Sequence, residues 1–192
     1  MAVKSNLTNM VVCLTATCLI CSAILGVVYA VTYDPIAATN EKILKDSIGQ
    51  VVPEGGEISE KMDLEVGGLP SEYYTSVKDG EVEAYAIKSQ TNGFGGPLIL
   101  MVGVLNDGTI YNTSVLSHSE TPGLGAKCTS DEKFISQWKG FDPSVKKLSV
   151  TKDGGDVDAI TASTITSRAY TLAIENAVKA ADALAGQNKE EE

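Results

Sequence analysis

The sequence predicts an α+β domain built around an antiparallel sheet and preceded by one N-terminal transmembrane helix. Three observations support this prediction. An uncharged apolar run covers residues 10–31, strand-like runs separated by turn residues dominate 83–119, and small apolar residues recur at helical spacing over 168–186. Because a chain of 192 residues is short for two domains and a membrane segment, we expect a single folded domain.

The apolar run lies between Lys4 and Asp34, and no charged residue interrupts it. Met10 to Val31 is long enough to cross a hydrocarbon core of about 30 Å at a rise of about 1.5 Å per residue. Val28-Tyr29-Ala30 is also a passable cleavage site, so a cleaved signal peptide is the alternative. We favour a retained anchor because the run is longer than the apolar core of most signal peptides. Lys4 favours a cytoplasmic N-terminus and an exported domain.

The predicted organisation has five parts: a cytoplasmic N-terminus at 1–9, the transmembrane helix at 10–31, a juxtamembrane helix with a connecting region at 32–82, the domain core at 83–186 and an acidic tail at 187–192. Asp34 and Pro35 are expected to start the juxtamembrane helix, since Asp caps helices and Pro is favoured at the first helical position. The glycine-rich and acidic stretch 53–72 has no clear period, so we expect a loop with room for one short strand.

The core begins with three predicted strands, "EAYAIKSQ" (83–90), "PLILMVGVL" (97–105) and "TIYNTSVLSHS" (109–119), of which the last two are joined by an Asn-Asp-Gly turn at 106–108. "KFISQWKGF" (133–141) predicts a short helix, and "VKKLSV" (145–150) predicts another strand.

The final helix is predicted from apolar residues at intervals of three or four positions. They are Ala169, Leu172, Ala173, Ala177, Ala180, Ala181 and Leu184.

Composition excludes several functions. A balance of 15 Lys and Arg against 25 Asp and Glu gives a formal charge of -10, which repels nucleic acid. Of the 4 cysteines only Cys128 lies outside the apolar run, so no disulfide can form within the exported domain. With His118 as the single histidine, we expect no metal site. Cys18 and Cys21 have the spacing of a metal or redox motif, but inside a membrane helix we interpret them as packing residues.

Three segments are candidates for a binding site. "DAITASTITSRAY" (158–170) gathers hydroxyl residues at the start of a helix, where they could cap the first N–H groups or help to hold a phosphate. "HSETPGLGAK" (118–127) is either an ordinary surface turn or a tight loop whose backbone approaches a flat ligand. "GFGGPLILMVGV" (93–104) opens a strand with glycines that permit close backbone approach.

The order of anchor, "GFGGPLILMVGV", "HSETPGLGAKC", "FISQWKG" and "DAITASTITSRAY" resembles the G subunits of Rnf electron-transport complexes, a family with an FMN-binding domain. It is more distantly similar to the C subunits of the sodium-translocating NADH:quinone reductase. The resemblance covers nearly the whole chain. It implies a flavoprotein that relays electrons within a ferredoxin:NAD+ oxidoreductase moving sodium ions or protons.

In the family that the chain resembles, Asp, two residues, Ser or Thr, Gly, Ala and Thr mark the site where an ApbE-type flavin transferase links FMN covalently, through its phosphate, to the last threonine. Here the pattern falls on Asp158, Thr161, Ala162, Ser163 and Thr164. The resemblance therefore implies attachment at Thr164, with Thr166 as the second choice. Ala162 replaces the family's Gly and Ser163 its Ala, so Ala162 is strained if that position needs a positive φ.

The resemblance also implies that the second segment lines the flavin ring, through Glu120, Thr121, Gly123, Leu124 and Gly125. It places the chain in the bacterial inner membrane as a single-pass protein with the FMN domain on the outer, periplasmic face. Because the sequence has no cysteine cluster for iron-sulfur centres and no nucleotide fingerprint, the chain completes no reaction alone. Other membrane, iron-sulfur and flavin subunits are the implied partners.

Two other functional classes compete with this interpretation. A hydrolase is disfavoured, because there is no GxSxG and the side chains of His118 and its neighbours Ser117 and Ser119 point to opposite faces of a strand. An exported assembly or sensor module that carries no flavin remains open, because Ala162 and Ser163 depart from the family pattern.

Overall fold

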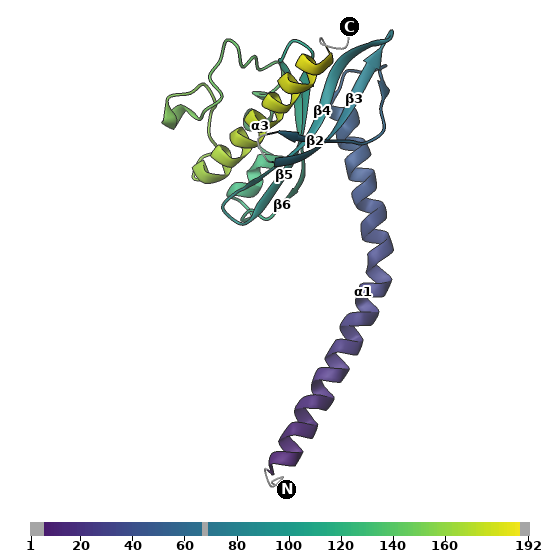
Figure 1. Cartoon of the computed structure of the whole chain (residues 1–192). Helices are drawn as coiled ribbons and strands as arrows, with labels where there is room; N and C mark the ends of the chain where they lie inside the picture. The colour runs from purple at the N-terminus through teal and green to yellow at the C-terminus, as the bar shows by residue number, and fades with distance from the viewer. Residues whose placement is uncertain (1–5, 67–68, 189–192) are drawn as a thin grey trace. The chain divides into compact units, whose positions relative to one another are not determined.

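A computed structural model describes residues 6–66 and 69–188 of the chain. The chain divides into two compact units, residues 1–43 and 44–192, and the boundary falls within the first helix. The second unit contains one sheet with a long helix, α3, against it (Figure 1). The α+β class predicted from the sequence is confirmed.

Helix α1 spans Leu7–Val51 and includes the whole predicted apolar segment. Its apolar part is long enough to cross a membrane, and large side chains such as Leu14 and Leu25 are exposed. The prediction of a second helix starting at Pro35 was wrong, because α1 continues through this residue. Proline removes only one N–H donor, the one that would bond to the carbonyl four residues earlier, and the helix on either side retains its own bonds.

Six antiparallel strands form the sheet in the order β1-β3-β4-β5-β6, with β2 paired to β3 off this path. They are β1 (Glu57–Ile58), β2 (Met62–Val66), β3 (Leu69–Lys78), β4 (Glu81–Asn92), β5 (Pro97–Leu105) and β6 (Ile110–His118). The three strands predicted over 83–119 are confirmed as β4, β5 and β6. The expectation of a loop with room for one short strand over 53–72 was wrong, because β1, β2 and the first part of β3 occupy more than half of it. Strand β1 has only two residues and is too short to show a period, whereas the alternation of apolar and acidic residues in β2 is a strand signal that sequence reasoning missed.

Strand β5 is buried on both faces, which explains its unbroken apolar sequence. Leu100 and Val102 belong to the cluster that packs on α3, whereas Met101 belongs to a second cluster with Ile48 and Val51 at the end of α1. Gly103 lies under this helix end, and a Cβ atom there would overlap the carbonyl oxygen of Val51. The sheet therefore lies between two helical segments.

Helix α3 spans Thr164–Asn188 and begins four residues before the predicted start at 168. The residues of its predicted apolar face are buried except Leu172, which is 48% exposed. The short helix α2, Glu132–Ser136, is confirmed, and the side chain of Asp131 accepts hydrogen bonds from the backbone at its N-terminus. The strand predicted at 145–150 is wrong, because this segment forms turns with one isolated bridge, Val150 to Val157.

Candidate functional site

A cavity of about 340 Å³ lies where the turn between β4 and β5, the loop after β6 and the start of α3 meet. This volume is within the range of small-molecule sites. Its lining residues are Phe94, Glu120, Thr121, Leu124, Gly125, Ala162, Ser163, Thr164, Ile165 and Thr166. The three segments singled out in the sequence therefore meet at one place, although Phe94 and Glu120 are 26 positions apart in the chain.

Most of the residues predicted for the site line this cavity. Those that do are Glu120, Thr121, Leu124, Gly125, Ser163, Thr164 and Thr166. Three predicted residues are not in its wall as the structure describes it: Asp158, Thr161 and Gly123. Asp158 exchanges backbone hydrogen bonds with the side chain of Gln137, which fixes the approach to the helix.

Two tight turns shape the cavity. In the loop after β6, Leu124 N donates to Thr121 O at 3.2 Å, with Pro122 second in the turn and Gly123 third at a φ of 77°. Before α3, Ser163 N donates to Ile160 O at 3.0 Å. Proline second and a positive φ third are the features of a type II turn.

Ala162 occupies the third position of the turn before α3, with a φ of 62°. The strain expected at this residue is thus present, and it costs about 1–2 kcal/mol relative to glycine. The backbone nevertheless keeps the conformation that a glycine would adopt.

The carboxylate of Glu120 joins all three segments. It is only 6% exposed, and it accepts hydrogen bonds from Phe94 N at 2.8 Å and from Thr166 Oγ1 at 2.7 Å. Gly95 N lies 3.4 Å from the same oxygen that Phe94 contacts. Gly93 and Gly125 flank the carboxylate, and a Cβ atom on either would overlap one of its oxygens. Glu120 therefore orders the cavity wall, and its side chain is engaged by the protein itself.

The hydroxyl groups at the helix start have different tasks. Ser167 Oγ accepts from Ile160 N at 2.9 Å and donates to Ser163 O at 3.0 Å, which ties the turn to the helix. Thr166 is 1% exposed and is held by Glu120. Thr164 is half-buried, and its hydroxyl faces Lys152. Of the two threonines, Thr164 is thus the accessible one.

The rim of the cavity is apolar. Phe94, Leu124 and Ile165 line it and are 69%, 45% and 52% exposed. Large apolar side chains that remain exposed around a cavity are suited to an aromatic ring system. Sequence reasoning missed Phe94 and Ile165. An aromatic residue inside the glycine-rich "GFGG" was the available signal for Phe94, but Ile165 has no local signal.

Burial controls the titration of two groups in the core of the domain, Cys128 and Tyr170. It raises the pKa of the Cys128 thiol to about 11, and the nearby Glu120 carboxylate adds to this effect. Burial also raises the pKa of Tyr170, whose hydroxyl lies 2.8 Å from Thr113 Oγ1. Both groups therefore stay protonated at neutral pH. Within residues 6–66 and 69–188, no group of three or more His, Cys, Asp or Glu is arranged to hold a metal ion.

Comparisons with known proteins identify a family model and relatives that the chain matches. Residues 93–179 match the family model of the FMN-binding domain. The G subunit of the proton-translocating ferredoxin:NAD(+) oxidoreductase complex of Clostridium ljungdahlii is 34% identical over 170 residues, covering 86% of each chain. The G subunit of the ion-translocating oxidoreductase complex of Methanosarcina acetivorans is 31% identical over 183 residues, covering 93% of this chain and 96% of that one.

A solved structure is also similar: the C subunit of the Na(+)-translocating NADH-quinone reductase of Parabacteroides distasonis, at 24% identity and a TM-score of 0.48, covering 64% of this chain and 75% of that one.

Proposed function

Since the chain belongs to the family of G subunits of ion-translocating oxidoreductase complexes, we propose that it carries an FMN linked through its phosphate to Thr164 and relays electrons within such a complex. The flavin would supply the redox chemistry, and the chain would hold and orient it. The chain is one subunit of an oxidoreductase, so its electron donor and acceptor are other subunits of the complex.

One observation supports the proposal above all. Thr164 lies in the wall of the cavity, and all the lining residues fall within residues 93–179, which match the FMN-binding domain. The cavity fits the two ends of FMN. The exposed apolar rim of Phe94, Leu124 and Ile165 suits the ring system, and the N-terminus of α3 suits the phosphate, because its first N–H groups lack helical acceptors. Gly93 and Gly125 have no Cβ atom, so the backbone on both sides of the cavity can lie close to the carboxylate of Glu120.

Thr164 is favoured over Thr166 because a transferase must reach the hydroxyl. In the transfer, a bond forms between Thr164 Oγ1 and the flavin-side phosphorus of flavin adenine dinucleotide, and the bond from that phosphorus to the bridging oxygen breaks. Adenosine monophosphate leaves, and the hydroxyl proton passes to a base of the transferase or to solvent. Thr166 Oγ1 is buried and donates to Glu120 Oε2, so it is neither accessible nor free to react.

The test is the intact mass of the full-length protein co-expressed with an ApbE-type flavin transferase, followed by peptide mapping. We expect a gain of one FMN less one water on the peptide containing Thr164. Thr164→Ala should lose this gain while the domain stays folded, and Thr166→Ala should keep it. If flavin is missing only from the Thr166 variant, the attachment residue is Thr166 and the assignment to Thr164 is wrong. An unmodified wild-type mass would favour a module that carries no flavin.

We also propose that α1 is retained as a single membrane anchor, with the FMN domain on the outer face. The apolar side chains of residues 10–31 are exposed, as a lipid-facing segment requires. A covalent link would be useful outside the membrane, because it keeps the local flavin concentration high. The same mass measurement tests the anchor: residues 1–30 should be present, whereas a chain starting at Val31 would show a cleaved signal.

A further inference from the structure

A lysine that the sequence analysis did not single out contacts the proposed attachment residue. Nζ of Lys152 donates a hydrogen bond to Oγ1 of Thr164 at 3.1 Å. Lys152 belongs to the short 3-10 helix η2, Thr151–Asp153, in the loop before α3. An ammonium group has three N–H donors and this bond uses one, so the others can point to an anion beside the hydroxyl.

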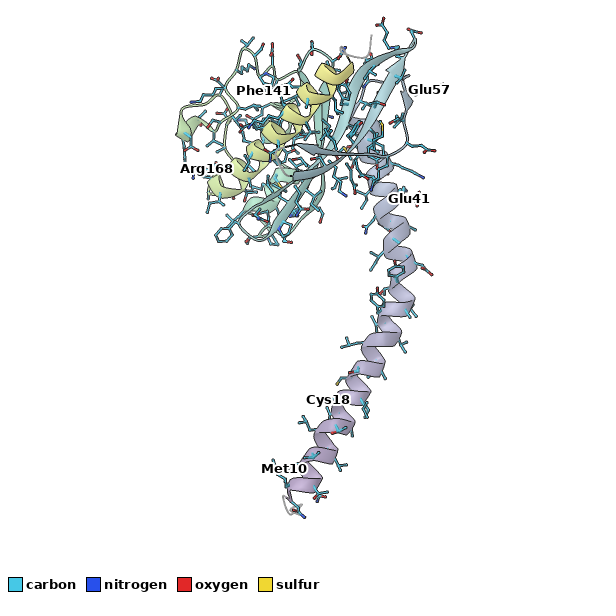
Figure 2. The ribbon with its side chains drawn as sticks, in the orientation of Figure 1. Met10, Cys18, Glu41, Glu57, Phe141 and Arg168 are labelled. Carbon is cyan, nitrogen blue, oxygen red and sulfur yellow. The ribbon has the colours of Figure 1, made fainter. Side chains whose placement is uncertain are left out.

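The residues around Lys152 are fixed relative to α3. Val150, two residues earlier, is 1% exposed and forms a bridge with Val157. Asp153, the next residue, accepts hydrogen bonds from Nε and Nη2 of Arg168, both at 2.7 Å. Arg168, labelled in Figure 2, lies in the second turn of α3. The backbone that carries Lys152 is therefore anchored on both sides, and the Arg168 guanidinium lowers the pKa of the Asp153 carboxyl.

A second, independent feature points to the same place. Ser163 is 7% exposed and lines the cavity, yet its hydroxyl has no hydrogen-bond partner among the described residues. A buried polar group without a partner costs about 1–3 kcal/mol. Such a group is expected to gain a partner when the site is filled. Ser163 immediately precedes α3, where backbone N–H groups also favour an anion.

We propose that Lys152 and Ser163, with the N-terminus of α3, hold the phosphate of the flavin attached to Thr164. This inference rests on the function proposed above. The ammonium of Lys152 balances the single negative charge that a phosphate keeps once it bears two ester bonds. The hydroxyl of Ser163 donates to a phosphate oxygen and thereby gains the partner that it lacks. Lys152 and Ser163 are positioning residues.

The experiment compares full-length Lys152→Met, Lys152→Arg and Ser163→Ala with wild type, and Lys133→Met is the control for loss of an exposed lysine. Each is incubated with the transferase and flavin dinucleotide, and occupancy is followed by intact mass. We expect Lys152→Met to slow attachment about two- to fivefold, since exposed charge contacts are weak and screened. The deficit should shrink at high salt, and Lys152→Arg should restore most of the rate. Lys133→Met should match wild type.

Ser163→Ala gives a readout that a purely structural role would not produce. Without flavin, its free energy of unfolding should equal or exceed that of wild type, because the unpartnered hydroxyl is removed. With flavin attached, it should be less stable than wild type, and the ³¹P resonance of the phosphodiester should shift in Ser163→Ala and in Lys152→Met.

The outcomes separate the two proposals. If wild type gains no flavin, the proposed function and this inference both fail. If wild type is modified at Thr164 but Lys152→Met behaves as Lys133→Met does, this inference alone is overturned. An equal effect of Ser163→Ala on the flavin-free and flavin-bound proteins would overturn the role of Ser163.

Discussion

Replacing Glu120 should destabilise the domain more than its position in a surface loop suggests. In Glu120→Ala, the N–H of Phe94 and the hydroxyl of Thr166 lose acceptors at 2.8 and 2.7 Å. Hydrogen bonds to a charged group contribute about 1.5–3 kcal/mol each, and the Phe94 N–H regains water because it is only partly buried. We therefore expect a loss of about 2–4 kcal/mol in the free energy of unfolding.

Glu120→Gln should cost less, about 1–2 kcal/mol, because the amide oxygen can still accept from Phe94 N and the Thr166 hydroxyl can turn to accept from the amide nitrogen. The single tryptophan, Trp138, is fully buried against Tyr170 and reports unfolding by its fluorescence in urea. Glu54→Ala, which removes an exposed carboxylate, is the control and should have little effect. If Glu120→Ala unfolds at the same urea concentration as Glu54→Ala, the carboxylate does not hold the three segments together and the reasoning is refuted.

Two further predictions concern the core. Gly103→Ala should lower the free energy of unfolding by about 1–3 kcal/mol, since its Cβ would overlap backbone atoms of Val51 and the end of α1 would have to move. Gly186→Ala, where a Cβ meets nothing within 4 Å, is the matched control in urea unfolding, and equal behaviour of the two variants would contradict the packing argument. The thiol of Cys128 has a pKa of about 11 in the folded chain and 9.0 as its ordinary value, so the folded state holds the proton more tightly. The contribution of the protonated thiol to the free energy of unfolding is complete below pH 9.0 and is lost as the pH rises to about 11. The free energies of unfolding of wild type and Cys128→Ala should therefore converge over this range. A constant difference would refute the linkage.

The sequence was sufficient where a signal is local. The uncharged run 10–31, the apolar strand 97–105 and the alanine-rich helix after Arg168 each have a pattern that can be read within one segment. Of the strands β1–β3, β1 has only two residues, too few to show a period, and the apolar–acidic alternation of β2 was missed because it lies within a glycine-rich and acidic stretch. The helix break at Pro35 was wrongly predicted, because local propensity does not reveal that the helix continues on both sides.

The candidate site likewise has features that the sequence revealed and features that only the structure revealed. The glycine loop, the hydroxyl cluster and their resemblance to a flavoprotein family were present in the sequence, and they identified most of the cavity wall. Only the tertiary structure decided the tasks of individual side chains: Glu120 holds Thr166, 46 residues away, and Lys152 reaches Thr164 across 12 residues. These partners are set by how loops close around the sheet, because hydrogen bonds between distant segments leave no periodic trace in the chain. The sequence determined the family and its motifs, and the fold decided which hydroxyl is accessible and which is buried.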